Sequence, residues 1–224
     1  MFSDRAEAGR QLATALARFQ GPDAVVLALP RGGVATAWEV ARLLDAPLDL
    51  VLVRKIGAPG YPEYGIGAIC DGPEPAVVLD QRAIALLGVP PSYVEEERRR
   101  QLAEIERRRA LWLGGRPRAA IEGRTAIVVD DGIATGGTMR AALTVLRRRR
   151  PRRLVLAVPV AAPQSLEALR GEADEVVCLY APPGFMAVGS YYGDFHQLAD
   201  EEVGDLLRRA AGFGAKAVPA PRGA

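Results

Sequence analysis

Residues 125–143, TAIVVDDGIATGGTMRAAL, carry the residue types best suited to chemistry in this chain. A run of β-branched and apolar residues ends in two adjacent acids, Asp130 and Asp131, and a Gly- and Thr-rich loop at 135–138 leads into a helix-like segment. Such a loop suits an anion, because backbone N–H groups and a helix N-terminus direct positive charge at it. The acids would repel that anion, so we expect them to accept hydrogen bonds from hydroxyl groups of the same ligand. A ribose 5-phosphate carries both kinds of group.

Two other phosphate-binding loops do not fit this stretch. A P-loop needs Lys before its final Ser or Thr, where this chain has Gly137. The dinucleotide fingerprint needs three glycines spaced G-x-G-x-x-G, which residues 125–143 do not contain. A nucleotide-binding Rossmann enzyme is therefore disfavoured. The chain also has no G-x-S-x-G sequence, which disfavours a serine hydrolase.

The segments on either side alternate between short apolar runs and helix-like stretches. Strands are expected at 24–30, 48–54, 125–131, 153–160 and 175–180, and helices at 4–19, 33–44, 137–150 and near 164–170. Continuous apolar strands separated by helices predict a Rossmann-like parallel sheet covered on both faces. Ligands of such sheets bind beyond the carboxyl ends of the strands, where PRGG (30–33), RKIG (54–57) and DDGIATGGT (130–138) all fall.

Residues 55–124 interrupt this alternation. The runs 65–70 and 76–80 flank a turn and predict a β-hairpin. Residues 91–113 predict one long charged helix with a narrow apolar stripe, supported by Glu–Arg pairs four residues apart. Two roles fit this helix: a solvated helix that packs one edge on the core, or a lid or homodimer element.

The composition is that of a globular α/β protein rather than an electrostatic binder of nucleic acid. The 224 residues carry a formal net charge of +2, and 49% of them are hydrophobic. The basic run LRRRRPRRL (146–154) offers a nucleic-acid contact, but we favour a helix end, where cations suit the dipole and Pro151 stops the helix. Cys70 and Cys178 are too few for a metal or disulfide framework. With no apolar span and no signal core, we expect a soluble cytoplasmic protein.

The stretch VVDDGIATGGT (128–138) closely resembles the phosphoribosyl-pyrophosphate (PRPP) loop of the type I phosphoribosyltransferases, and the element order is similar from the first strand to the fifth. The resemblance implies a single domain over residues 1–224, with an α/β fold of the Rossmann-like type, an insertion at 55–124, a C-terminal hood at 181–203 and a loose tail at 213–224. It also implies that PRPP is bound by Asp130, Asp131, Gly132, Ile133, Ala134, Thr135, Gly136, Gly137 and Thr138.

The resemblance predicts a second anion site in the loop that ends the first strand. In the family, backbone N–H groups of this loop bind pyrophosphate, often through a strained or cis peptide, and here the loop offers Arg31, Gly32 and Gly33. A mobile loop after the second strand closes over PRPP in the family and excludes water. Here it corresponds to residues 55–70, and we expect Lys55 to contact pyrophosphate and to act in catalysis. A solvated lysine at a strand end fits the same sequence.

The hood over the acceptor is the least specific part of the resemblance. Residues 181–203 are similar to the F-x-V-G…D-[YF] segment of the purine-salvage branch, which makes Phe185 the ring expected to stack on a base and Asp194 an acid of its pocket. The spacing between the two is longer here, and core packing of Phe185 fits as well. The 6-oxopurine enzymes carry an acid where this chain has Ala134, so hypoxanthine and guanine are disfavoured as acceptors.

The resemblance implies a transferase that moves the 5-phosphoribosyl group of PRPP to a nitrogenous base and releases pyrophosphate. Asp130, Asp131 and Lys55 are the expected catalytic residues, and the acids would favour positive charge at the anomeric carbon. Mg²⁺ is the expected cofactor, held through substrate oxygens and water rather than directly by side chains. The alternative is a regulatory protein that binds PRPP without chemistry. No membrane partner is expected, and a nucleic-acid partner is disfavoured.

Overall fold

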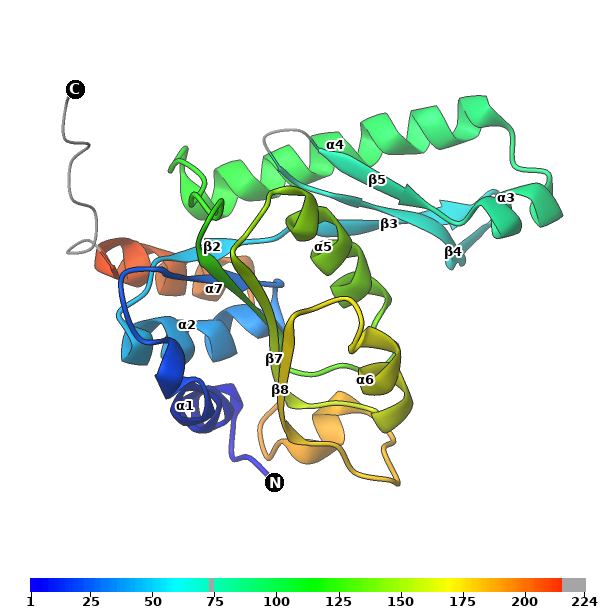
Figure 1. Ribbon diagram of the computed structural model, residues 1–224. Helices are drawn as coiled ribbons and strands as arrows, with labels where there is room; N and C mark the ends of the chain where they lie inside the picture. Colours follow the sequence, from blue (N-terminus) through cyan, green and yellow to red (C-terminus); the bar gives the residue numbers. More distant parts are fainter. Residues whose placement is uncertain (73–74, 215–224) are drawn as a thin grey trace.

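The computed structural model describes residues 1–72 and 75–214, so most of the tail predicted at 213–224 lies outside the described residues. A parallel sheet with the strand order β2-β1-β6-β7-β8 forms the centre of the fold (Figure 1). Its strands are β1 (Ala24–Ala28), β2 (Leu48–Leu50), β6 (Thr125–Val129), β7 (Arg153–Val160) and β8 (Glu175–Tyr180). The predicted α/β class with a Rossmann-like parallel sheet is confirmed.

Both faces of this sheet are buried, because alternate residues of each strand belong to two separate apolar clusters. Val26 and Ile127 lie in one cluster, and Val25 and Val128 lie in the other. The first is covered by α1 (Arg5–Ala15), α2 (Gly32–Leu44) and α7 (Asp200–Arg209), and the second by α5 (Gly137–Arg148) and α6 (Pro163–Leu169) (Figure 1). Two buried faces explain why the strands are continuous apolar runs in the sequence.

The strand order places β1 beside β6 at the point where the winding of the sheet reverses. From β1 the chain passes through α2 to β2 on one side, and from β6 it passes through α5 to β7 on the other. Ligands of open parallel sheets bind in the crevice at such a point. Because residues 30–33 follow β1 and residues 130–138 follow β6, the fold brings the two predicted anion loops together.

Residues 53–72 and 75–113, here called the arm, lie against α5 and project beyond the parallel sheet (Figure 1). The arm consists of an antiparallel sheet of β3 (Val53–Ala58), β4 (Tyr61–Cys70) and β5 (Ala76–Leu79), followed by α3 (Gln81–Leu87) and α4 (Pro91–Leu113). Helix α4 runs along this sheet (Figure 1) and buries Ile105 and Trp112. The predicted hairpin and the long helix with one buried edge are confirmed.

The prediction of one strand at 48–54 is wrong, because the chain changes sheets within it. Strand β2 ends at Leu50, and β3 begins at Val53 in the antiparallel sheet. Residues 55–70, expected as a loop, are mostly paired strand, since β3 and β4 form a hairpin whose turn includes Gly60 at φ 74°. Burial continues through the change of sheet, so the apolar pattern shows no break there.

Some helical elements have no counterpart in the sequence prediction. Helix α3 and helix α7 were not expected, and the helix predicted at 4–19 ends at Ala15, with a 3₁₀ turn η1 (Ala17–Phe19) after it. Two further 3₁₀ turns, η2 (Val188–Tyr191) and η3 (Ala210–Gly212), lie near the C-terminus. Over the part of the chain that the structure describes, no helix is both long enough and apolar enough to cross a bilayer.

Candidate functional site

Asp130 and Asp131, here called the acid pair, follow β6 directly at the carboxyl edge of the sheet. The Asp131 N–H donates to Asp130 Oδ1 at 2.9 Å, and Asp131 Oδ2 accepts from Arg5 Nε at 2.8 Å. Burial, and then the adjacent Asp131 carboxylate, raise the pKa of Asp130 well above its usual value. Hydroxyl donors that bind the pair would stabilise its ionised form by hydrogen bonding.

The loop at 30–33, here the PRGG loop, lies directly against the acid pair. A Cβ on Gly32 would stand 1.8 Å from Asp131 Oδ2, and one on Gly33 would stand 2.9 Å from both Cα and Oδ1 of Asp130. No larger residue fits either position without moving the acids. The peptide bond between Pro30 and Arg31 is cis. Helix α2 starts at Gly32, so its free N-terminal N–H groups open at the acid pair.

The loop at 135–138, here the TGGT loop, leads into the N-terminus of α5. Gly136 is the N-cap residue of α5 with φ 77°, a conformation that favours glycine, and a Cβ there would stand 3.1 Å from Leu169 Cδ1. Upstream, the Ile133 N–H donates to Val160 O and the Ala162 N–H donates to Ile133 O, both at 2.9 Å. These bonds fix the segment to the end of β7 and direct the α5 N-terminus to the same edge as the acids.

The structure places the Arg31 side chain against the hood rather than in an open anion site. Its Nη1 donates to Leu198 O at 3.0 Å, and its Nε lies 3.8 Å from the Asp200 carboxylate. The pyrophosphate contact expected of Arg31 stays a prediction. The donors that the loop offers an anion are the backbone N–H groups at the start of α2.

The hood contacts the acid pair and the residue after it. A Cβ on Gly132 would stand 2.5 Å from Val188 Cγ1, and the Tyr192 hydroxyl donates to Asp131 O. Burial, and then the negative charge of Asp131, raise the pKa of Tyr192, so its hydroxyl stays a donor. Phe2 packs on Tyr192 with ring centroids 5.5 Å apart. The hood therefore closes one side of the site.

The two base-site candidates, Phe185 and Asp194, have different surroundings in the hood. The Phe185 ring stacks on Tyr191 at 5.6 Å with an interplanar angle of 20° and packs against a small apolar cluster that includes Tyr192. Asp194 is exposed, and its carboxylate lies 3.0 Å from Nδ1 of His196. In this structure, Phe185 therefore packs among the other aromatic side chains of the hood.

Lys55 lies on the arm, where it is exposed and opposite Ala68 in the β3–β4 register. It shares a face of β3 with Val53, because side chains alternate along a strand. Val53 packs against the cluster that contains Met139 and Leu143 of α5. Lys55 therefore projects from the face of the arm that is turned toward α5, the helix whose N-terminus carries the TGGT loop.

Sequence reasoning missed Arg5, Tyr192 and Phe195. Arg5 donates to both Asp131 Oδ2 and His196 O, each at 2.8 Å, and its guanidinium carbon lies 3.9 Å from the Phe195 ring centroid. A signal for Arg5 exists in the sequence, since a cation is unfavourable in the first turn of a helix. Tyr192 and Phe195 belong to an irregular segment whose packing no periodic pattern reveals.

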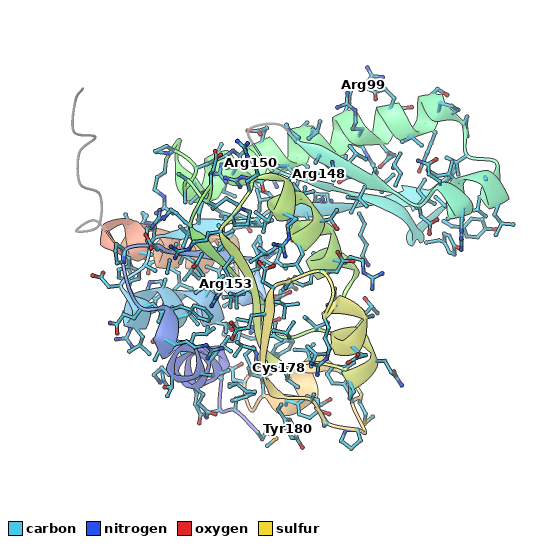
Figure 2. The ribbon with its side chains drawn as sticks, viewed as in Figure 1. Arg99, Arg148, Arg150, Arg153, Cys178 and Tyr180 are labelled. Carbon is cyan, nitrogen blue, oxygen red and sulfur yellow. The ribbon has the colours of Figure 1, made fainter. Side chains whose placement is uncertain are left out.

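The basic run at 146–154 lies at the opposite end of the sheet from the acid pair. Figure 2 shows Arg148, Arg150 and Arg153 near the amino end of β7, far from Tyr180 at the carboxyl end of β8. Ion pairs occupy four of its arginines: Arg147–Asp174, Arg150–Glu122, Arg152–Asp23 and Arg153–Glu175. The predicted helix end is present, because α5 ends at Arg148 within the run. The ion pairs make the run a charge-paired surface.

Known proteins are similar to this chain in sequence and in fold. The "Putative phosphoribosyl transferase Rv0571c" of Mycobacterium tuberculosis is 45% identical over 210 residues, which are 94% of this chain and 47% of that protein. The chain thus spans about half the length of the curated relatives it matches. A "Uracil phosphoribosyltransferase" of Lactobacillus gasseri is 43% identical over 61 residues, or 27% of this chain and 29% of that protein.

The structural comparison agrees with the sequence comparison. The crystal structure of TT1426 from Thermus thermophilus superposes with a TM-score of 0.81 at 48% identity, and the match covers 94% of this chain and 99% of that one. The sequence profile of the phosphoribosyl transferase domain matches residues 5–186, which is most of the chain. The chain therefore belongs to the type I phosphoribosyltransferase family.

Proposed function

We propose that this protein is an enzyme that transfers the 5-phosphoribosyl group of PRPP to a nitrogenous base and releases pyrophosphate. The observation that carries the proposal is the contact of the PRGG loop with the acid pair, Gly32 on Asp131 and Gly33 on Asp130. The N-termini of α2 and α5 both follow strands of the parallel sheet at the carboxyl edge that holds the two carboxylates. A ligand with an anion at each end and hydroxyls between them matches this order of groups, and PRPP is such a ligand.

Each loop then takes one part of PRPP. The TGGT loop binds the 5-phosphate through backbone N–H groups and the hydroxyls of Thr135 and Thr138. The acid pair accepts hydrogen bonds from the 2- and 3-hydroxyls of the ribose. The PRGG loop binds pyrophosphate through its backbone N–H groups. Residues 132–134 carry the chain between the acids and the phosphate loop.

In this proposal, Mg²⁺ is held through substrate oxygens and water. Among the described residues, no three His, Cys, Asp or Glu side chains gather as a metal site. Mg²⁺ commonly keeps several waters and binds one or two carboxylates together with substrate phosphates. The ion would supply charge neutralisation at the pyrophosphate.

Catalysis in this proposal rests on charge and on the exclusion of water rather than on a side-chain base. The acid pair stabilises the positive charge that develops at the anomeric carbon as pyrophosphate leaves, and the base attacks from the opposite face with inversion. Lys55, carried by the β3–β4 hairpin, stabilises the negative charge on the departing pyrophosphate. The hood and the hairpin together keep water from the reacting centre.

The acceptor is a base held beneath the hood. Phe185 and Asp194 remain the proposed base contacts, although the Phe185 ring stacks on Tyr191 here. Ala134 leaves the position without the acid that 6-oxopurine enzymes carry. That difference and the local likeness to a uracil phosphoribosyltransferase favour a base other than hypoxanthine or guanine.

The test is a panel of nucleobases with PRPP and Mg²⁺, in which pyrophosphate release is followed. The proposal expects release that depends on one class of base and is lost in the Asp130→Asn/Asp131→Asn variant. The competing function is a regulatory protein that binds PRPP without transfer, which predicts saturable PRPP binding and no release with any base. An RNA-binding role predicts instead a steep salt dependence of RNA affinity, which the charge-paired 146–154 surface disfavours.

A further inference from the structure

Arg5 occupies an unusual position, buried at the first residue of α1. Asp4 caps the helix by accepting from the Glu7 N–H, and Arg5 follows it with only 9% of its side chain exposed. A cation in the first turn opposes the helix dipole. Burial of a guanidinium also removes its hydration. Because both effects disfavour Arg5 at this position, its interaction partners must stabilise it there.

Those partners belong to three separate parts of the site. Arg5 Nε donates to Asp131 Oδ2 at 2.8 Å, across 126 positions of the chain. Its Nη1 donates to the backbone oxygen of His196 in the hood at 2.8 Å, and its guanidinium carbon lies 3.9 Å from the centroid of the Phe195 ring. A Cβ on Gly32 would stand 3.0 Å from Arg5 Nε, so the PRGG loop borders the same group.

The segment before Arg5 joins the hood as well. The Phe2 N–H donates to Tyr191 O at 2.8 Å, and the Gly193 N–H donates back to Phe2 O at 2.8 Å. The Asp194 N–H donates to Ser3 O at 2.7 Å. Residues 2–5 therefore connect the hood to the acid pair, with backbone bonds at one end and the Arg5 guanidinium at the other.

We propose that Arg5 is a positioning residue of the PRPP site, which orients the Asp131 carboxylate and docks the hood on the acid pair. The inference rests on the proposed function, because the acid pair is there assigned to the ribose. By taking Oδ2, Arg5 leaves Oδ1 of Asp131 for a substrate hydroxyl. A lysine would keep the charge, but it lacks the planar group that bonds in two directions and stacks on a ring.

The charged groups around the pair give this role a second consequence. Asp130 Oδ1 accepts from the Asp131 N–H, and Asp131 accepts from Arg5 at Oδ2 and from the Tyr192 hydroxyl at its backbone oxygen. The His196 side chain turns to Asp194 and Glu202 instead. The positive charge of Arg5 lowers the pKa of Asp130 against the larger effects of burial and Asp131. Loss of Arg5 therefore raises the pKa of Asp130 further, and ligand binding that needs an ionised pair fails at a higher pH.

The experiment compares Arg5→Gln and Arg5→Lys with Arg10→Gln. Arg10 lies on the same helix, but it is half-exposed and pairs with Glu39. Binding of PRPP with Mg²⁺ is measured by calorimetry between about pH 5 and 8, and hydrogen exchange of residues 188–198 is measured without ligand. We expect Arg5→Gln to weaken PRPP binding roughly tenfold or more. The acid limb of the binding profile, where affinity falls as the pH is lowered, should move to higher pH. Hydrogen exchange in the hood should become faster. Arg5→Lys should restore the acid limb but not the slow exchange.

Two results would overturn the inference. One is Arg5→Gln with wild-type PRPP affinity and an unshifted acid limb. The other is hood exchange in Arg5→Gln that matches the wild type and Arg10→Gln. A wild-type protein that does not bind PRPP at any pH would instead refute the proposed function, and hood exchange would still decide whether Arg5 docks the hood.

Discussion

Gly32 and Asp131 lie so close together that a Cβ on the glycine would stand 1.8 Å from the carboxylate oxygen Oδ2. One residue follows β1 and the other follows β6, nearly a hundred positions later in the chain. Their contact joins the PRGG loop to the acid pair at the winding reversal of the sheet, where ligands of open parallel sheets bind.

Gly32→Ala should therefore displace either the acid pair or the start of α2. We expect the free energy of unfolding to fall by about 1–3 kcal/mol and PRPP binding to weaken strongly. Chemical denaturation and calorimetry check both effects. Gly171→Ala is the matched control, because a Cβ there meets nothing within 4 Å. A Gly32→Ala protein with wild-type affinity would show that this contact does not shape the ligand site.

Asp130→Asn should stabilise the fold while weakening ligand binding. The pKa of Asp130 is raised by burial and by Asp131, so ionisation of Asp130 in the folded protein opposes folding. Asparagine still accepts from the Asp131 N–H through its Oδ1. At neutral pH we expect a gain of about 1 kcal/mol in the free energy of unfolding.

The pH dependence of that gain has a definite sign. An acid with a raised folded pKa favours folding most below its unfolded pKa, and this contribution is lost as pH rises through the folded value. The wild type and Asp130→Asn should thus approach equal stability at acidic pH and diverge toward neutral pH. Thermal denaturation across this range tests the prediction, and a constant difference would contradict it.

A buried ion network fixes the arm to the core, and its loss should be costly. Arg109 of α4 donates at 3.2 Å to both Asp49, which lies in β2 of the parallel sheet, and Asp71, which directly follows β4 of the arm. Arg118 also pairs with Asp71, and Asp49 Oδ2 accepts from the Ala119 N–H at 2.8 Å.

Arg109→Met should lower the free energy of unfolding by about 3–5 kcal/mol, because it leaves two buried carboxylates with fewer partners. Arg107→Met on the exposed side of α4 loses only a surface pair with Glu104 and should cost less than about 1 kcal/mol. Urea denaturation compares the two variants. Equal small losses would mean that the network does not hold the arm.

Lys55→Ala tests the role given to the arm. If Lys55 stabilises the departing pyrophosphate, turnover with the preferred base should fall roughly hundredfold, while PRPP affinity changes much less. Arg99→Ala is the control, since Arg99 projects from α4 of the same arm into solvent (Figure 2). Equal effects on affinity and turnover would place Lys55 in ground-state binding instead.

The sequence predicts the parallel sheet and the two loops well, because both depend on local patterns. Burial on two faces makes the strands continuous apolar runs, and the helix at 91–113 has the predicted bounds. The switch from β2 to β3 leaves no such trace, since Val51 and Leu52 stay buried across it. The role of Arg5 is not predicted for another reason. Its partners are brought to it by the tertiary fold, and Asp131 lies 126 positions away in the chain.

Binding of PRPP by the acid pair and its two flanking loops is the step on which the proposed chemistry depends. Calorimetric titration with PRPP and Mg²⁺ tests it most directly, on the wild type, on Asp130→Asn/Asp131→Asn and on a control. The control is Asp205→Asn, at an exposed position of α7. We predict saturable binding by the wild type in roughly the micromolar to millimolar range, the same affinity in Asp205→Asn, and loss of binding in the double variant with its fold intact. Absence of binding by the wild type, or equal affinity in the folded double variant, would contradict this assignment of the site.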